Sequence, residues 1–306
     1  MTQALPVHRQ SPASDLIEIP LSARICERDL PFAAALQAEE PIALAVITGV
    51  VGASYRPVGA VMIFDATGRS FGNLSSGCIE RDVGIHAAEA LSDGQIRRLR
   101  YGAGSPYLDL QLPCGGGLDI LVIPRPDLNA LRAAEADLAA RRPSRLDLVD
   151  IRLEILPELR FLIFGKGPET RSLSHLARAA GYQVATYSPD PETLQGLSDG
   201  HILPSARWPE GVIPDNRSAV ALFFHDHDWE PPLLTTALRS EAFFIGAQGS
   251  KRAHDARCAT LAHIGLSAAE IERLASPFGL IPSLRDPQSL AVSVLAQVLE
   301  RATRAA

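Results

Sequence analysis

The sequence predicts an α/β protein: a small N-terminal α/β domain followed by a domain built on a doubly wound parallel sheet. Three observations predict this fold class. The chain has 306 residues, 46% of them hydrophobic, which suffices for two domains with separate cores. An Arg- and Pro-rich polar stretch over residues 139–157 interrupts the apolar pattern. After this stretch, short apolar runs alternate with helical segments, as they do in parallel sheets that carry helices on both faces.

The compositional break also sets the expected domain boundaries. Residues 1–15 read as a polar tail and residues 16–142 as the N-terminal domain. Residues 143–158 are expected to link the two domains, because polar and Pro-rich composition is typical of connecting segments. Residues 159–306 form the expected C-terminal domain.

In the first half, the apolar run Ile42–Val50 predicts a strand buried on both faces, because it lacks the polar alternation of a half-exposed strand. An Ala-rich amphipathic stretch over residues 14–36 predicts one or two helices. The other expected elements are a strand over Val58–Asp65 that ends at a Thr67-Gly68 turn, a helix over Cys78–Leu91, a strand over Leu118–Ile123 and an Asp127-capped helix that ends at Arg141.

The second half repeats a strand–helix unit. The strand Phe161–Phe164 ends at Gly165-Lys166-Gly167, and a helix is expected from there to Ala180, with Gly181 as its stop. Further strands are expected over Gln183–Tyr187, Ser218–Phe224 and Ala242–Ile245. Further helices are expected over Pro231–Arg239, over Arg252–Ile264, after the capping box Ser267–Glu270 and after Asp286-Pro287.

Composition excludes several classes of protein. The balance of 29 basic and 35 acidic residues gives a net charge of −6, which argues against a nucleic-acid binder. No apolar run approaches the roughly 20 residues that a membrane span needs. The first twenty residues lack an apolar signal core, and the four cysteines show no Cys-x-x-Cys pair. We therefore expect a cytoplasmic protein with free thiols, no structural zinc and no membrane association.

The Gly165-Lys166-Gly167 turn has the context of a dinucleotide-binding turn, since it follows a strand and precedes a helix. Backbone amides at a helix N-terminus favour a phosphate, and glycines let it approach. The pattern is incomplete, because Thr170 replaces the third glycine and Ser188 stands where an acidic ribose ligand is expected. Ordinary NAD(P) binding, a glycine turn with no ligand, and a nucleotide or pterin-phosphate site with altered chemistry all stay open.

Two other loops of the second half carry polar groups. Gln248-Gly249-Ser250-Lys251-Arg252 joins a strand to a helix, and its two cations lie in the first helical turn, where the helix dipole disfavours positive charge. An anion would relieve that conflict, although both side chains can also extend into solvent. His225-Asp226 follows the strand over Ser218–Phe224, at the edge where ligands bind in such sheets. A metal site there lacks a third ligand at definite spacing.

Two cysteines of the first half stand in unusual surroundings. Cys78 follows Gly77 close to a predicted helix start, where amides and the helix dipole favour a thiolate. Cys114 precedes Gly115-Gly116-Gly117, a run whose amides stay open to a ligand. A third loop offers Ser54 and Arg56, which suit a phosphate or oxyanion. Buried packing is the alternative for either thiol and the expectation for Cys26 and Cys258.

In their order, these motifs resemble the XdhC/CoxI family, the xanthine dehydrogenase accessory factors. The resemblance runs from about Leu30 to Leu299, nearly the whole chain. In the first half the matching segments are Gly52–Met62, Gly72–Glu80 and Cys114–Gly116. In the second half they are Phe164–Gly167, His225-Asp226, Ile245–Arg252, Pro277–Leu280 and Ser289–Ala296.

The resemblance implies a molybdenum-cofactor chaperone, an accessory factor rather than an enzyme. Members of the family bind the cofactor, support its sulfuration together with a cysteine desulfurase, and help to insert it into enzymes of the xanthine dehydrogenase and aldehyde oxidase type. The resemblance also implies a Rossmann-like C-terminal domain and self-association, so a homodimer is expected. The cofactor is molybdopterin or a dinucleotide form, and the latter would add a cofactor nucleotidyltransferase to the partners.

The expected site follows from the same resemblance. Cys78 and Cys114 are expected near the molybdenum or its sulfur, and no resident metal site is expected. The remaining expected cofactor-binding residues are Ser54, Arg56, Gly77, Glu80, Gly115, Gly116, Gly165, Lys166, Gly167, His225, Asp226, Gln248, Gly249, Ser250, Lys251 and Arg252.

The chain departs from the family pattern in places. Ser76 stands where the family more often has Gly, Pro168 where His is common, and Ser188 where an Asp usually ends the second strand. Ile281–Leu284 replaces the usual Asp-Ile-Gly-Ala. Two rival functions stay open: an NAD(P)-dependent oxidoreductase, which requires saturable nicotinamide binding, and an adaptor that binds only the client enzyme and no small molecule.

Overall fold

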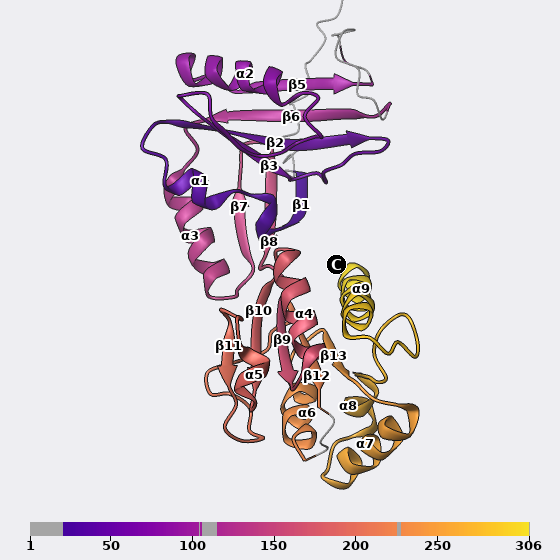
Figure 1. The fold of residues 1–306 in the computed structure, drawn as a ribbon. Coiled ribbons are helices and arrows are strands. Elements are labelled where there is room, and N and C mark those ends of the chain that lie inside the picture. Colours follow the sequence, from indigo (N-terminus) through magenta and orange to yellow (C-terminus); the bar gives the residue numbers. More distant parts are fainter. Residues whose placement is uncertain (1–20, 104, 106–114, 225–227, 306) are drawn as a thin grey trace, which may run out of the picture. The chain divides into compact units, whose positions relative to one another are not determined.

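A computed structural model of the chain describes residues 21–103, 105, 115–224 and 228–305 (Figure 1). The chain divides into two compact units, Met1–Leu156 and Pro157–Ala306. Each unit has its own sheets and its own buried core. None of the helices in the described ranges is long and apolar enough to span a membrane.

The first unit is built on a five-stranded sheet with the strand order β4-β3-β2-β6-β5. All of its neighbouring strands are antiparallel. The strands are β2 (Ile42–Val51), β3 (Val61–Asp65), β4 (Ser70–Gly72), β5 (Arg97–Gly102) and β6 (Gly117–Pro124). The expected burial of β2 on both faces is confirmed, because Leu44 and Val46 join one core and Ala45 and Ile47 the other.

Both faces of this sheet are covered (Figure 1). Helix α2 (Glu80–Asp93) lies on one face and packs through Val83, Ala87, Ala90 and Leu91. The other face is covered by α1 (Phe32–Leu36), α3 (Leu128–Ala139) and a second sheet of three strands. That sheet has the order β1-β8-β7, formed by β1 (Leu21–Cys26), β8 (Ile151–Leu156) and β7 (Ser144–Asp147).

Two predictions for the first half differ from the structure. Part of the segment predicted as helical, Leu21–Cys26, is strand β1, and residues 14–20 of that stretch lie outside the described residues. Most of the expected linker forms β7 and β8 of the first unit. The physical reason is the same for both segments: every second side chain of β8 is buried, and β1 pairs with it in parallel. The alternation of residues 151–156 is itself typical of a strand, but the polar, Pro-rich composition around it favours a linker.

The second unit is built on a six-stranded sheet with the order β11-β10-β9-β12-β13-β14, in which all neighbours are parallel. This order is that of a Rossmann-like fold, so the predicted doubly wound sheet is confirmed. The strands are β9 (Arg160–Gly165), β10 (Gln183–Ser188), β11 (Gly200–Ile202), β12 (Ser218–Phe223), β13 (Phe244–Ala247) and β14 (Leu274–Ala275).

Helices cover both faces of the parallel sheet. Helices α4 (Pro168–Ala179) and α9 (Pro287–Ala305) share a core with one face. Helices α6 (Glu230–Arg239) and α7 (Lys251–His263) share a core with the other. Two short helices, α5 (Pro191–Leu194) and α8 (Ala268–Glu272), complete the described part, and α8 begins at the predicted Ser267–Glu270 capping box.

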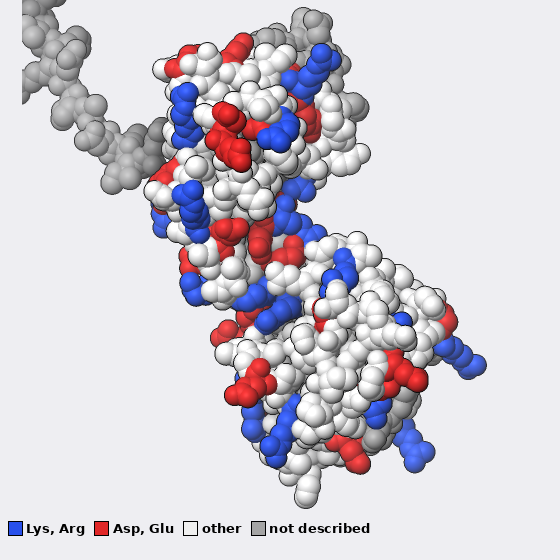
Figure 2. Space-filling model, turned by 60° about the vertical axis from the view of Figure 1, so that its left-hand side comes forward, with Lys and Arg blue, Asp and Glu red and all other residues white. Residues whose placement is uncertain are grey.

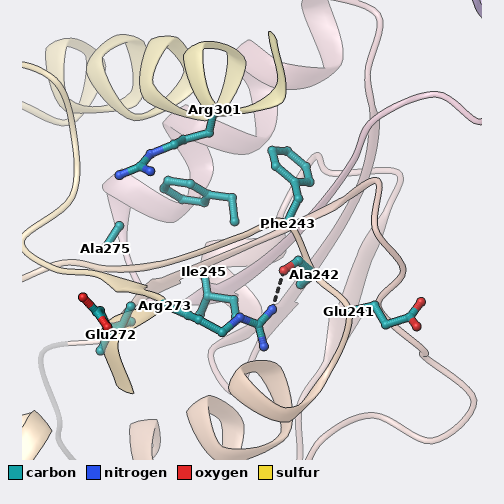
Figure 3. Close-up of a pocket in the computed structure, with 10 residues that line it drawn as sticks. Glu241, Ala242, Phe243, Ile245, Glu272, Arg273, Ala275 and Arg301 are labelled. Atoms are coloured by element: carbon teal, nitrogen blue, oxygen red, sulfur yellow. Dashed lines mark hydrogen bonds between the residues drawn. The ribbon is translucent and has the colours of Figure 1, made fainter. Parts of the chain in front are cut away.

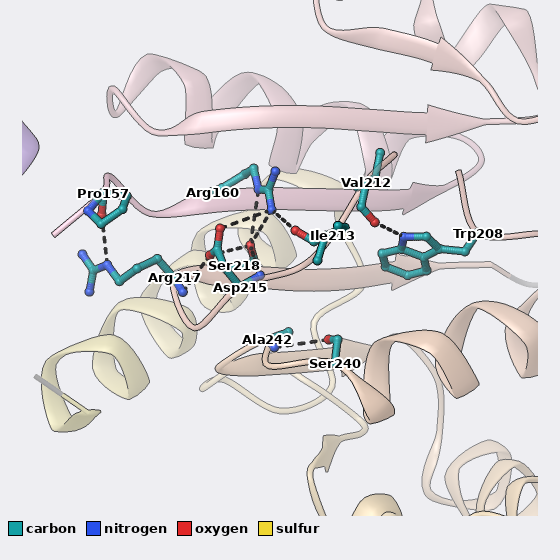
Figure 4. A network of polar contacts seen from close by, with 10 residues as sticks. All are labelled: Pro157, Arg160, Trp208, Val212, Ile213, Asp215, Arg217, Ser218, Ser240 and Ala242. Carbon is teal, nitrogen blue, oxygen red and sulfur yellow. Dashed lines mark hydrogen bonds and ion pairs between the residues drawn. The ribbon is translucent and has the colours of Figure 1, made fainter. Parts of the chain in front are cut away.

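A polar network closes the amino-terminal edge of the parallel sheet (Figure 4). The Arg160 guanidinium, at the start of β9, donates to the Ser218 hydroxyl over 3.0 Å and to the Ile213 carbonyl over 2.6 Å. The Ser218 hydroxyl in turn donates to Asp215 over 2.9 Å. These contacts fix the start of β12 to β9, so the loops free to form a site are those at the carboxyl edge.

A buried ion pair fastens that carboxyl edge. Arg257 of α7 donates to both carboxylate oxygens of Glu230, from Nε over 2.9 Å and from Nη2 over 2.8 Å, and both side chains are almost fully buried. Arg257 also donates to the Ser276 hydroxyl over 2.6 Å and to the Gln248 carbonyl over 2.9 Å. One guanidinium therefore joins α6, α7 and two loops.

We expect Glu230→Gln to destabilise the second unit, because it leaves the Arg257 guanidinium buried without a counter-charge. Breaking a buried ion pair in this way costs about 3–5 kcal/mol of unfolding free energy. Both tryptophans of the chain, Trp208 and Trp229, lie in the second unit. Their fluorescence during urea unfolding therefore measures the stability of that unit.

Asp255→Asn is the matched control. Asp255 pairs with Lys251 on the same helix over 3.0 Å, but both side chains are exposed. Exposed pairs contribute about 0–1 kcal/mol. Equal losses of stability in the two variants would contradict the importance assigned to the buried pair.

Candidate functional site

Three loops that carry the sequence motifs of the first unit leave the same end of its five-stranded sheet. Strand β2 ends at Val51, which pairs with Gly117 at the start of β6, and Gly102 at the end of β5 also pairs with Gly117. On the other side of β2, Met62 near the start of β3 pairs with Gly72 at the end of β4. The loops over residues 52–60 and 73–79, together with residues 103, 105, 115 and 116 of the third loop, therefore leave the sheet toward the same end.

The loop after β2 is held by its own polar side chains. The Ser54 hydroxyl donates to the Arg56 carbonyl over 2.8 Å and accepts from the Arg56 amide over 3.3 Å. The Arg56 guanidinium is anchored to Asp29 over 2.6 Å, while its buried Nε has no hydrogen-bond partner among the described residues. Between these anchors, the side chain of Tyr55 is 77% exposed. Sequence analysis missed Tyr55, because exposure of one loop residue leaves no periodic signal.

The loop after β4 is organised by Glu80, the first residue of α2. Its carboxylate accepts hydrogen bonds from the amides of Leu74, Ser75 and Ile79 over 3.3, 2.7 and 3.1 Å, and from the Ser75 hydroxyl over 2.7 Å. Burial opposes ionisation of Glu80, but the hydrogen bonds from Ser75 and Ile79 outweigh it, so its pKa lies below the usual 4.5. The sequence predicts that Glu80 contacts a cofactor. In the structure, its carboxylate fixes the conformation of this loop through these hydrogen bonds.

Cys78 is presented by this loop. Its side chain is exposed, its sulfur lies 3.8 Å from the Ser76 hydroxyl, and its amide donates to the Ser75 hydroxyl over 3.1 Å. The helix begins at Glu80 with Ile79 as its N-cap, so neither serine caps it and Cys78 stands two residues before it. A ligand can therefore reach the thiol from solvent.

The glycine run before β6 lies against the loop after β2. A side chain at Gly52, whose φ is +72°, would lie 3.5 Å from the Cα atom of Gly116, so the two backbones pass closely. Gly116 also accepts a hydrogen bond from the Ala103 amide over 3.0 Å. Gly115 is exposed, and Cys114 lies outside the described residues. The described part of this loop thus meets the loop that holds Ser54 and Arg56.

The other predicted residues belong to the second unit, at the carboxyl edge of its parallel sheet. Lys166 lies with its Nζ 5.5 Å from the centre of the Trp229 ring, a cation–π contact. The Gly167 amide donates to the Thr193 hydroxyl over 2.8 Å. His225 and Asp226 lie outside the described residues.

Hydrogen bonds within the second unit also hold the loop after β13 in place. The Gln248 carbonyl accepts from Arg257, and the Ser250 hydroxyl caps α7 by accepting from the Ala253 amide over 3.2 Å. The Lys251 ammonium pairs with Asp255, so this ion pair relieves the expected conflict with the helix dipole without a bound anion. Gly249 and Arg252 are exposed in the same region.

The described residues group no metal ligands, and one cavity of the second unit lies away from the predicted residues. Within the described ranges, no three His, Cys, Asp or Glu side chains are grouped so that they could hold a metal ion. A cavity of about 440 Å³ lies at the opposite, amino-terminal edge of the parallel sheet, beside Phe244 and Arg301. Its Arg273 is already bound to backbone carbonyls, including that of Ala242 over 2.7 Å (Figure 3). Acidic and basic side chains are interspersed on the face drawn in Figure 2.

Glu80→Gln is expected to loosen the loop over residues 74–79, because a neutral amide replaces the carboxylate that its amides bind. A hydrogen bond to a charged group contributes about 1.5–3 kcal/mol, so hydrogen exchange at the Ser75 and Ile79 amides should become at least roughly tenfold faster. Since the folded pKa of Glu80 lies below 4.5, the carboxylate's contribution is present above pH 4.5 and is lost as the pH falls through the folded value.

The control for this variant is Glu89→Gln, an exposed glutamate on the same helix that pairs with His86. It should leave the exchange of the Ser75 and Ile79 amides unchanged. Indistinguishable exchange in the two variants would show that Glu80 does not organise the loop.

Comparison with known proteins agrees with the resemblance. Residues 35–102 match the model of the XdhC and CoxI family, and residues 161–298 match the model of the XdhC Rossmann domain. The molybdenum cofactor insertion chaperone PaoD of Escherichia coli (strain K12) is 31% identical over 284 residues, which cover 86% of this chain and 84% of PaoD.

A solved structure supports the fold. The crystal structure of a xanthine dehydrogenase from Bacillus halodurans has a TM-score of 0.74 to this chain at 20% sequence identity. The match covers 90% of this chain and 96% of that one, and at this identity it concerns the fold alone. Two family models match in order, and a relative above 30% identity spans most of the sequence, so the chain belongs to the XdhC/CoxI family.

Proposed function

We propose that this chain is a chaperone for the molybdenum cofactor and that the three loops at one end of the first unit's sheet bind it. The observation that carries this proposal is the shared origin of the loops. Strand pairing brings the Cys78 loop, the Ser54–Arg56 loop and the Gly115-Gly116 segment to one end of a sheet. The similarity to PaoD, a molybdenum cofactor insertion chaperone, indicates the kind of cargo.

The residues of these loops fit such a cargo chemically. The cofactor combines an anionic phosphate, a planar pterin with hydrogen-bonding edges, and a molybdenum atom held by sulfur. Arg56 offers a cation, and Cys78 offers an accessible sulfur, a ligand type that suits soft metals. Exposed Tyr55 offers an aromatic face for a planar ring, and Gly115 offers open backbone.

Each group then has a distinct task. Cys78, held by the loop that Glu80 organises, would contact the molybdenum or its sulfur, and the same role is proposed for Cys114, which lies outside the described residues. Arg56 would bind the phosphate while Asp29 fixes its orientation through their 2.6 Å contact. Cys78 and Tyr55 are exposed, which suits a carrier, because a cargo destined for another protein has to leave.

The finer features of the proposal concern partners. The client is a molybdoenzyme of the xanthine dehydrogenase or aldehyde oxidase type, and a cysteine desulfurase supplies the sulfur that converts the cofactor before insertion. The proposed form of the chain is a homodimer in the cytoplasm. If the chain carries a dinucleotide form of the cofactor, a cofactor nucleotidyltransferase is a further partner. The cofactor supplies the redox centre only once it is inside the client, so this chain needs no catalytic group of its own.

Cys78→Ser is expected to weaken cofactor binding at least about tenfold, which corresponds to ~1.4 kcal/mol of binding free energy. The reason is that a hydroxyl cannot replace the thiol as a soft ligand. The measurement is the pterin retained per protein after purification with added molybdenum cofactor, read from the fluorescence of the oxidised pterin.

Cys258→Ser serves as the control, because this half-buried thiol lies on α7 of the second unit, outside the proposed site. It should retain as much pterin as the unaltered protein. Equal retention by the Cys78 and Cys258 variants would remove Cys78 from the site. If the unaltered protein retains no pterin, cofactor binding itself is refuted and an adaptor without a small molecule takes its place.

A further inference from the structure

The glycine turn of the second unit stands where Rossmann-like folds hold the pyrophosphate of a dinucleotide. It connects the first strand, β9, to helix α4 beside the point where the strand order reverses. In a dinucleotide-binding turn, amides at the helix N-terminus donate to the phosphate, and an acidic side chain after the second strand binds the ribose. The hydrogen bonds of this turn can therefore be compared, one by one, with what a dinucleotide requires.

Two amides of the turn are already in use. The Gly167 amide donates to the Thr193 hydroxyl over 2.8 Å, and the Lys166 amide donates to the Phe223 carbonyl over 3.2 Å. The next residue, Pro168, has no amide hydrogen. Thr193 is itself only 1% exposed. Its hydroxyl therefore occupies the position of a phosphate oxygen relative to the Gly167 amide.

The group expected to bind the ribose is also in use. Asp190 follows β10, but its Oδ1 accepts from the Glu192 amide over 3.1 Å and its Oδ2 accepts from the Thr193 hydroxyl over 2.6 Å. Ser188, at the end of β10, accepts from the Asp190 amide over 3.1 Å. The Asp190 carboxylate thus caps helix α5 and supports the hydroxyl that closes the turn, so its oxygens are engaged within the protein and not set to bind a ribose diol.

Charge and packing oppose a pyrophosphate as well. A side chain at Gly167 would lie 3.7 Å from the Glu169 carboxylate, so a negative group borders the turn. The third glycine of a dinucleotide motif is replaced by fully buried Thr170, whose hydroxyl would lie 2.5 Å from a Cβ atom at Gly165. Helix α4 therefore packs on β9 through a threonine, and the carboxylates of Asp190 and Glu169 already lie near the turn together with the Lys166 ammonium, which interacts with Asp190.

We infer that this turn is an internal clamp, closed by the Thr193 hydroxyl, and that it does not hold the pyrophosphate of NAD(P) or of any other dinucleotide. The residues present do not fit such a ligand, although the fold implies one. The same chemistry excludes from this turn the pyrophosphate of a dinucleotide form of the molybdenum cofactor. Cofactor binding by the loops of the first unit is independent of the clamp, so either can fail without the other.

Two measurements on the full-length protein test the clamp. The first is a calorimetric titration with NADH and with NADPH, in which no saturable binding is expected. The second is hydrogen exchange at the Gly167 amide in Thr193→Ala and Thr193→Ser. The alanine variant removes the acceptor and should exchange roughly tenfold faster, while the serine variant keeps a hydroxyl and should stay protected. The Lys166 amide is the internal reference, because its acceptor is Phe223 in all variants.

Each of the following results would contradict the internal clamp at Gly167. Saturable binding of either nucleotide that also protects the Gly167 amide would overturn it. Unchanged exchange at Gly167 in Thr193→Ala, with Lys166 still protected, would show that the hydroxyl does not close the turn and would overturn it too. Loss of protection at both amides in the alanine variant but not in the serine variant would mean that Thr193 holds the unit together rather than clamping one amide, which also contradicts it.

Discussion

The register of the five-stranded antiparallel sheet is the constraint on which the proposed site depends. Because β2 pairs antiparallel with both β3 and β6, the segment after β2 and the segments before β3 and β6 leave the sheet toward the same end. A shift of register by one residue would turn Leu44 and Val46 toward the wrong core, so burial on both faces fixes the alignment. The sheet thus sets the end toward which these loops extend, and buried Leu74 and Ile79 pack the Cys78 loop into the core.

The two units use glycine-rich turns in opposite ways. In the first unit, Gly52 and Gly116 let two backbones approach while Tyr55, Cys78 and Gly115 stay exposed. In the second unit, Thr193 satisfies the Gly167 amide from within, and Arg257 ties down the loop after β13. A turn with the sequence context of a ligand site therefore serves as a structural joint. This difference is the physical ground for assigning cargo binding to the first unit and not to the nucleotide-binding edge of the second.

Much of the fold could be predicted from local pattern, whereas the site depends on contacts distant in sequence. The strand β2, the Asp127-capped helix and the strand–helix alternation of the second half each carry a period or cap that is visible in the sequence. Strands β1 and β8 were missed because each is short and is stabilised by pairing with the other across the unit. The bond from Gly167 to Thr193 spans 26 residues, and nothing local in the sequence indicates it.

Protection of Cys78 from alkylation by added molybdenum cofactor is the most direct test of the site. The alkylation rate of each cysteine is measured by mass spectrometry with and without cofactor, and Cys258 of the second unit serves as the reference in the same molecule. If the cofactor lies among the three loops, it should slow alkylation of Cys78 several-fold and leave Cys258 unchanged. Equal rates at Cys78 with and without cofactor, in protein that demonstrably carries it, would place the binding site elsewhere.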